Sequence, residues 1–204
     1  MMPLTPIVKH MLILNVIVFL AIKMLPENIG QMMPFYSPAT GFFQPFQIIT
    51  YMFTHFDVSH IFFNMLSLFF LGPMVEMALG AKRFLGLYMI SGLVALAAHF
   101  LVYYLPYYLG TTYSPPQFAV LGASGSVFGV TIAFATLFPD RQLMLLFPPI
   151  PIRAWLMAII LVGIGLYQGI TGTGGNIAHF AHLGGALAGF VLARHWKAGG
   201  RFLK

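Results

Sequence analysis

Long apolar stretches, separated by short segments rich in glycine or proline, dominate the hydrophobic pattern of this 204-residue chain. A membrane-spanning helix needs about 20 mostly apolar residues. Six stretches meet this need, at about 7–25, 57–78, 84–105, 123–139, 153–170 and 178–195. The short connections leave no room for a second domain. The pattern therefore predicts an all-α polytopic membrane protein, with one six-transmembrane-helix domain over residues 1–204.

Composition supports this class. Apolar residues make up 59% of the chain and charged residues 7%, whereas soluble globular proteins have about 45–50% and about 25%. The mean hydropathy is +0.89. The net charge of +6 does not predict nucleic-acid binding, because the basic residues form no cluster with interleaved aromatic residues. The chain has no cysteine, which excludes disulfides, thiolate metal sites and a cysteine nucleophile.

Basic residues are distributed unevenly between the predicted loops. If the six helices alternate in direction, one side of the membrane holds Lys9, Lys82, Arg83, Arg141, Arg153, Arg194, Lys197, Arg201 and Lys204. The other side holds only Lys23. Cytoplasmic loops carry an excess of Lys and Arg, so the sequence predicts cytoplasmic N- and C-termini. The second, fourth and sixth helices then run from the outside inwards.

Two outer connections differ from the others. Residues 26–56 form a long segment rich in Phe, Met, Tyr and Pro, and we expect it to lie in the membrane interface rather than in water. The turn at 171–176 is rich in glycine, and we expect it to be mobile.

Four polar side chains stand out, because polar groups within lipid are costly and therefore mark functional sites. His60 and Asn64 lie in the first two turns of the second helix and share one face. Ser124 opens the fourth helix, and His182 lies about one turn into the sixth. All three helices begin outside, so the four side chains form a layer in the outer third of the membrane.

The fourth and sixth helices each carry a pair of glycines four residues apart, Gly125 with Gly129 and Gly185 with Gly189. Such pairs let helix backbones approach closely in lipid. If these faces meet, Ser124 and His182 come within hydrogen-bonding reach.

This arrangement predicts a serine nucleophile with a histidine base. His60, Asn64 and the amides that open the fourth helix can donate hydrogen bonds to an oxyanion. Gly122 and Gly125 permit a tight turn and a close approach of substrate. Phe128 lies on the same face as Ser124 and is placed to stack on the base.

None of the four carboxylates is placed to complete a triad, so we expect a Ser–His dyad without cofactor or metal. A zinc protease would need a motif such as H-E-x-x-H, and an aspartyl dyad would need two neighbouring buried Asp. We expect other roles for three further histidines. His99 is a structural residue of the third helix, His55 anchors a loop to a helix, and His179 lies nearer the surface, where it could compete with His182 as the base.

These residues resemble the rhomboid family of intramembrane serine proteases over nearly the whole chain. The matching segments are 55–64 with its H-x-x-x-N ending, 72–76 followed by Gly80, 122–125, and 181–182 followed by Gly185 and Gly189. The resemblance implies the minimal bacterial six-helix form with catalytic Ser124 and His182. It also implies oxyanion roles for His60 and Asn64, and a structural role for Glu76, which would hold the loop after the second helix.

The chain departs from the family pattern at two places. Phe46-Gln47 stands where the family often has a Trp-Arg pair, which puts the stability or lipid contacts of the first outer loop in question. Phe128 stands where a Tyr often stacks on the base, so a ring face is retained and a hydroxyl is lost. Neither change removes a chemical role.

The resemblance implies cleavage of single-pass membrane proteins near the outer end of their spanning helix, in the bacterial inner membrane. We expect lateral substrate entry at the fifth helix, with the loop at 171–177 as a cap. A catalytically silent rhomboid-like binder that escorts membrane proteins is the alternative, although it predicts loss of Ser124 or His182. A small transporter predicts inverted repeats and broken helices, and the sequence has neither.

Overall fold

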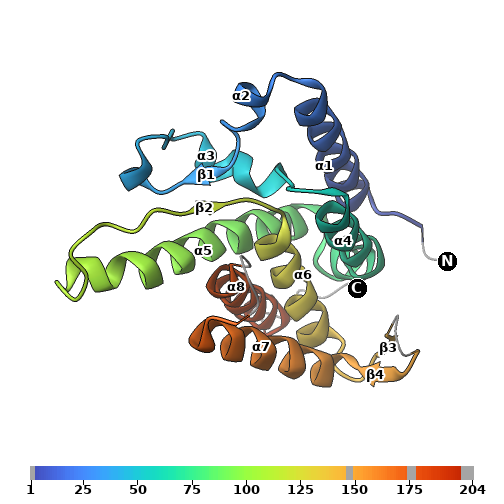
Figure 1. Ribbon diagram of the computed structural model, residues 1–204. Helices are drawn as coiled ribbons and strands as arrows, with labels where there is room; N and C mark the ends of the chain where they lie inside the picture. The colour runs from blue at the N-terminus through green and yellow to red at the C-terminus, as the bar shows by residue number, and fades with distance from the viewer. Residues whose placement is uncertain (1–2, 146–148, 174–177, 199–204) are drawn as a thin grey trace.

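The computed structural model describes residues 3–145, 149–173 and 178–198. Helices occupy all six stretches where the hydrophobic pattern predicts them (Figure 1). The six long helices are α1 (Pro6–Met24), α4 (Val58–Leu79), α5 (Ala81–Tyr108), α6 (Ser124–Leu137), α7 (Ala154–Thr171) and α8 (His179–Ala198).

Four of these helices, α1, α4, α5 and α7, are long and apolar enough to cross a membrane. Helix α6 has 14 residues and is about 21 Å long at 1.5 Å per residue, which is less than the hydrocarbon thickness of about 30 Å. A short helix packed inside a bundle can begin below the membrane surface. Ser124 is the first residue of this short helix.

The connection between α1 and α4 is structured rather than extended. Its elements are α2 (Glu27–Gly30), β1 (Phe35–Tyr36), η1 (Pro38–Thr40), α3 (Gln47–Thr50) and η2 (Tyr51–Phe53). Strand β1 pairs antiparallel with β2 (Ala119–Val120), and a second pair joins β3 (Gln142–Met144) to β4 (Pro151–Arg153). The all-α prediction missed these strands because two- and three-residue strands leave no periodic signal.

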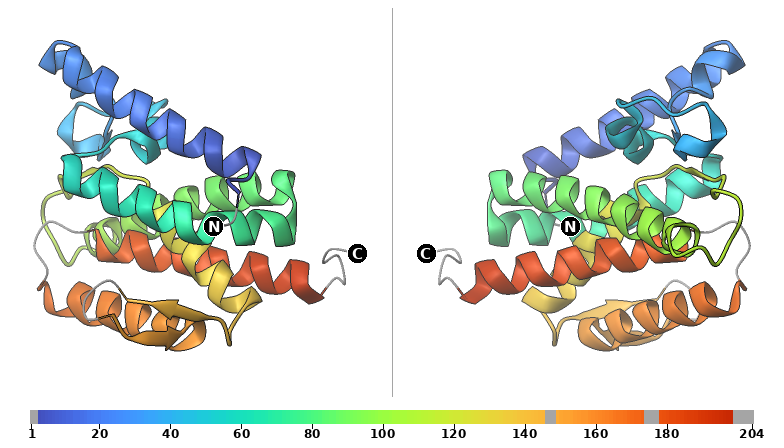
Figure 2. Two further views of the ribbon diagram at one scale, coloured as in Figure 1. Left: turned by 90° about the vertical axis from the view of Figure 1, so that its right-hand side faces the viewer. Right: turned by 90° about the vertical axis from the view of Figure 1, so that its left-hand side faces the viewer.

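Helix α6 lies in the middle of the bundle and packs against α4, α5 and α8. Helices α1 and α7 lie at opposite edges (Figure 2). Within their apolar windows only 17% of α1 and 11% of α7 is buried, compared with 44% of α4 and 39% of α5. The two edge helices therefore present most of their apolar surface to lipid.

Glycine pairs set the distance between α6 and α8. Gly185 faces the backbone of Gly125, and Gly189 faces the backbone of Gly129, so closely that a Cβ atom on either α8 glycine would overlap a carbonyl oxygen of α6. This is the meeting of faces that the glycine spacing predicts. Close packing of backbones is one of the forces that drive helix association in lipid.

Glu76 is buried within α4, with 3% of its surface exposed. Its carboxylate accepts hydrogen bonds from the hydroxyl of Thr5, from the Ile7 amide at 3.0 Å and from the Val8 amide at 2.9 Å. The side chain therefore caps the start of α1, rather than the loop after α4 as expected. A carboxylate is favourable there because unpaired amides and the positive end of the helix dipole coincide.

Replacing Glu76 by Gln is expected to lower the free energy of unfolding by about 3 kcal/mol, because a buried charge-assisted cap is lost and the amide NH2 opposes backbone donors. Reversible unfolding in mixed micelles measures the change. Asp140→Asn is the matched control, since the Asp140 side chain is 85% exposed and its partner Arg153 lies 4.0 Å away. We expect that control to change stability by less than about 0.5 kcal/mol. Equal effects of the two variants would contradict the capping role.

Candidate active site

A sharp turn delivers Ser124 to the first position of α6. The chain leaves β2, and the Gly122 amide donates to the Tyr51 carbonyl at 2.9 Å. Gly122 has φ +117°, and a Cβ there would lie 2.7 Å from the His60 ring. Both the backbone conformation and the contact with His60 require glycine at this position.

His55 holds the residue that precedes Ser124. Its Nε2 accepts a hydrogen bond from the Ala123 amide at 3.4 Å, and its ring packs edge-on against His60 with centroids 5.1 Å apart. Burial, together with the neighbouring His60, lowers the pKa of His55 to about 4. The ring is therefore neutral at pH 7, as an acceptor at Nε2 must be. His55 anchors the start of α6 as well as the loop that carries it.

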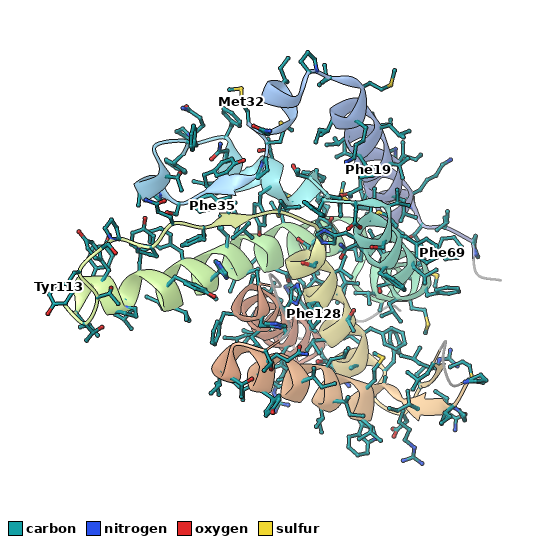
Figure 3. All side chains as sticks on the ribbon, in the orientation of Figure 1. Phe19, Met32, Phe35, Phe69, Tyr113 and Phe128 are labelled. Atoms are coloured by element: carbon teal, nitrogen blue, oxygen red, sulfur yellow. The ribbon has the colours of Figure 1, made fainter. Side chains whose placement is uncertain are left out.

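Ser124 and His182 lie in direct contact. Ser124 Oγ is 2.7 Å from His182 Nε2, and both residues are half-buried. The Phe128 ring stacks on the His182 ring, with centroids 4.4 Å apart and an angle of 9° between the planes. Figure 3 shows Phe128 pointing from α6 into the bundle. Stacking fixes the plane of the imidazole so that Nε2 stays directed at the serine oxygen.

The His60 ring lies against the Gly122 turn, and Asn64 lies one turn further along the same face of α4. Asp57 caps α4, and its carboxylate accepts the His60 amide at 2.7 Å and the Ser59 hydroxyl at 2.7 Å. These bonds lower the pKa of the exposed Asp57 carboxyl. Asn64 Nδ2 donates to the His60 carbonyl at 3.0 Å. The His60 ring therefore lies at the turn that presents Ser124, while one amide hydrogen of Asn64 is engaged within α4.

Gly125 has the packing role that its spacing from Gly129 predicts, but not the expected role in the turn. It lies inside α6 rather than in the turn, and its φ is not positive. A Cβ there would overlap the Ala95 side chain and would lie 3.8 Å from the Ala181 carbonyl oxygen. Gly125 is therefore a packing residue between α5, α6 and α8, and the turn depends on Gly122 alone.

Two further histidines, His179 and His99, lie near the site without contacting Ser124. His179 is buried, with 8% of its surface exposed, and its ring centroid is 6.5 Å from that of His182. The His99 ring is packed among aromatic rings, 4.6 Å from Tyr103 and 4.8 Å from Phe118. Of the candidate bases, His182 alone is hydrogen-bonded to Ser124 within the described part of the chain.

Gln47 organises the connection that precedes α4. No sequence pattern predicts this role, apart from the place of Gln47 beside Phe46 where the family pattern differs. Its side chain is almost fully buried. Oε1 accepts from the amides of Tyr36 at 3.2 Å and Gln44 at 3.1 Å. Nε2 donates to the carbonyls of Met32 at 3.1 Å and Phe42 at 3.0 Å. Gln47 thus holds the loop in which the family often has Trp-Arg, and Tyr36 connects it to β2 and so to the Ser124 turn.

Replacing Gln47 by Leu is expected to leave these four backbone groups without partners at nearly constant volume. We expect amide hydrogen exchange at Tyr36 and Gln44 to become about 100-fold faster, corresponding to about 2–3 kcal/mol of local stability. Gln44→Leu is the matched control, because the Gln44 side chain is exposed. Unchanged exchange in Gln47→Leu would show that the side chain does not hold the loop.

The expected cap at 171–177 falls partly on residues 174–177, which lie outside the described residues. Helix α7, the expected entry gate, ends at Thr171 and Gly172 follows with φ +68°. Among residues 3–145, 149–173 and 178–198, no group of three or more His, Asp or Glu is arranged to hold a metal ion. The chemistry available at the site is that of a hydroxyl, an imidazole and nearby hydrogen-bond donors.

The sequence is similar to several proteins that are named as rhomboids. The chain is 34% identical over 144 residues to "Rhomboid protein 1, mitochondrial" of Saccharomyces cerevisiae, covering 71% of this chain and 40% of the yeast protein. It is 34% identical over 165 residues to "RHOMBOID-like protein 12, mitochondrial" of Arabidopsis thaliana, covering 76% and 48%. It is 29% identical over 147 residues to "Rhomboid protease GluP" of Bacillus subtilis, covering 72% and 25%. The chain thus spans less than half the length of these three relatives.

A family model, that of the rhomboid domain, matches residues 43–196. This match covers every described side chain of the Ser124 site, from His55 to His182. Together with the apolar helices, it shows that the chain is an integral membrane protein of the rhomboid family.

Proposed function

We propose that the protein is an intramembrane serine endopeptidase in which Ser124 is the nucleophile and His182 the general base. The observation that carries the proposal is the 2.7 Å contact between Ser124 Oγ and His182 Nε2, with the imidazole held by Phe128. A relative from Bacillus subtilis is named a rhomboid protease, which supports the same class of activity.

In the first step, His182 Nε2 takes the proton of the Ser124 hydroxyl while Oγ attacks the carbonyl carbon of the substrate. The amides of Ser124 and Gly125 open α6 and have no carbonyl one turn earlier in the helix to pair with. They can donate to the oxyanion at the positive end of the helix dipole. His60 and Asn64 complete this donor set in our proposal. Collapse of the intermediate breaks the C–N bond, and His182 returns the proton to the leaving amine.

In the second step, water attacks the Ser124 ester and gives its proton to His182. The acyl carbon is released as a carboxylic acid, and the proton returns to Ser124 Oγ. Water must therefore reach a site within the membrane, which a short α6 beginning below the surface allows. The His182 imidazole accepts and returns a proton in both steps, so both steps depend on its fixed orientation.

In our proposal the chain is one domain with six membrane spans and cytoplasmic termini, in the bacterial inner membrane. Its partners are membrane lipid and single-pass membrane proteins, which it cleaves near the outer face. A helical substrate has its carbonyls hydrogen-bonded, so the cleaved segment must unwind, and Gly or Pro in it should favour cleavage. We place lateral entry at α7, which has little buried surface. Full activity after crosslinking α7 to α4 would contradict this entry route.

Active-site labelling tests the proposed nucleophile. We expect a fluorophosphonate probe to label the wild type in liposomes, and to label neither Ser124→Ala nor His182→Ala. Ser126→Ala is the matched control, because Ser126 is buried on the same helix and its hydroxyl contacts Met52 instead. Labelling that persists in Ser124→Ala would show that another residue is the nucleophile.

A further inference from the structure

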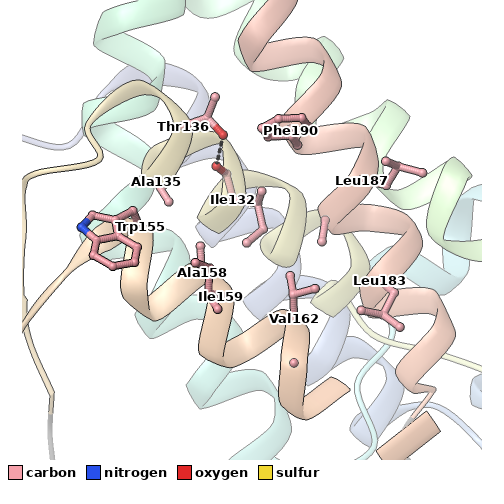
Figure 4. A pocket seen from close by; sticks show the side chains of 12 residues that line it. Ile132, Ala135, Thr136, Trp155, Ala158, Ile159, Val162, Leu183, Leu187 and Phe190 are labelled. Carbon is pink, nitrogen blue, oxygen red and sulfur yellow. Dashed lines mark hydrogen bonds between the residues drawn. The ribbon is translucent and has the colours of Figure 1, made fainter. Parts of the chain in front are cut away.

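An apolar groove lies between α7 on one side and α6 and α8 on the other (Figure 4). Its volume is about 640 Å³, which is within the range of ligand pockets. Most of its lining is apolar, including Ile132, Trp155, Val162, Leu187 and Phe190. The groove is lined by α7 and by α6 and α8, the helices that carry Ser124 and His182, but neither of these two residues lines it.

Basic side chains gather where the groove ends. Lys197 Nζ donates to the carbonyl of Thr136 at 3.2 Å, and Thr136 lines the groove. Arg153 directly precedes α7, two residues before Trp155, and its side chain is 61% exposed beside the exposed Asp140. Arg141 and Arg194 are exposed at the same ends of α6 and α8. Asp140 is the carboxylate that lies beside Arg153.

We propose that this groove binds one acyl chain of an anionic phospholipid, with the headgroup held near Lys197 and Arg153. An apolar slot facing hydrocarbon, with a tryptophan and Lys or Arg at its polar end, matches the chemistry of such a lipid. A helix is about 10–12 Å across with side chains. A volume of about 640 Å³ therefore covers only about one to two turns of a helix, which favours an acyl chain over a second copy or another protein.

Tryptophan quenching tests this proposal without reference to the proposed activity. The chain has two tryptophans, and Trp196→Phe leaves Trp155 as the only reporter at the groove. The protein is placed in phosphatidylcholine bilayers with a minor fraction of acyl-brominated lipid, either phosphatidylglycerol or phosphatidylcholine. We expect stronger quenching by the brominated phosphatidylglycerol, since each basic side chain contributes a preference of about five-fold.

Matched variants separate the headgroup site from the acyl slot. Lys197→Gln and Arg153→Gln should each reduce the preference for phosphatidylglycerol, whereas Lys82→Gln, which removes an exposed charge on α5, should not. Ala158→Phe fills the groove and should weaken quenching by both lipids. Ile164→Phe, at a half-exposed position of α7 outside the groove lining, should not.

Two results would overturn the proposal. Equal quenching by the two lipids would show that the basic residues select no headgroup. Weak quenching by both lipids that does not change in Ala158→Phe would show that protein, such as a second copy, fills the groove. Helical circular dichroism of each variant verifies that the fold is intact.

Discussion

Replacing Ser124 by Ala is expected to reduce cleavage of a membrane-spanning substrate by at least about 10⁴-fold, as loss of the nucleophile does in well-studied serine proteases. The physical reason is that no hydroxyl remains within reach of His182 Nε2, so neither the acyl intermediate nor its proton transfer can form. The measurement is the initial rate of product formation by purified protein in liposomes, with substrate in excess.

The double variant Ser124→Ala/His182→Ala sharpens this prediction. Residues that act as one unit have effects that do not add, so we expect the double variant to be no slower than Ser124→Ala alone. Ser126→Ala should retain near wild-type activity. Additive losses from the two single substitutions would contradict a shared role, since they would mean that the serine and the histidine act in separate steps.

Replacing Gly185 by Ala is expected to lower the free energy of unfolding by about 2–3 kcal/mol and to reduce activity by about 100-fold. A Cβ at this position overlaps the backbone of Gly125, so α8 must move away from α6, and overpacking of this kind costs about 1–3 kcal/mol. His182 lies one turn earlier on α8 and moves with it. A displacement of about 1 Å in a reacting group costs about 100-fold in rate.

The matched control is Gly163→Ala on α7, where a Cβ meets no atom within 4 Å. Alanine favours a helix over glycine by about 1 kcal/mol, so this control should be neutral or slightly stabilising. Unfolding in mixed micelles and the liposome rate assay measure both variants. If Gly185→Ala behaved like Gly163→Ala, the close contact between α6 and α8 would not be what holds His182 beside Ser124.

The features that depend on the pattern of residues within a single helix could be predicted from the sequence. The helix positions follow from apolar length, and the meeting of α6 with α8 follows from the spacing of Gly125, Gly129, Gly185 and Gly189. The depth of Ser124 and of His182 along their helices then indicates that they can meet. The stacking position of Phe128 follows from the helical repeat alone.

The contacts that the sequence could not predict join residues far apart in the chain. Glu76 has three donors at the start of α1, about 70 residues earlier, and nothing near Glu76 in the sequence indicates these partners. His55 binds the Ala123 amide 68 residues later. Gln47 binds backbone groups of a loop that has no periodic pattern. In each case a side chain forms hydrogen bonds with backbone groups. Every residue type has these backbone groups, so the sequence does not show which of them is the partner.

The most direct test of the proposed function is a cleavage assay in liposomes that contain only this protein and a single-pass membrane protein with Gly or Pro in its spanning segment. Mass spectrometry of the fragments locates the cut. We predict cleavage in the outer part of the spanning segment by the wild type and none by Ser124→Ala. A folded wild type that binds the substrate and leaves it intact would contradict the proposal and would identify a rhomboid-like binder.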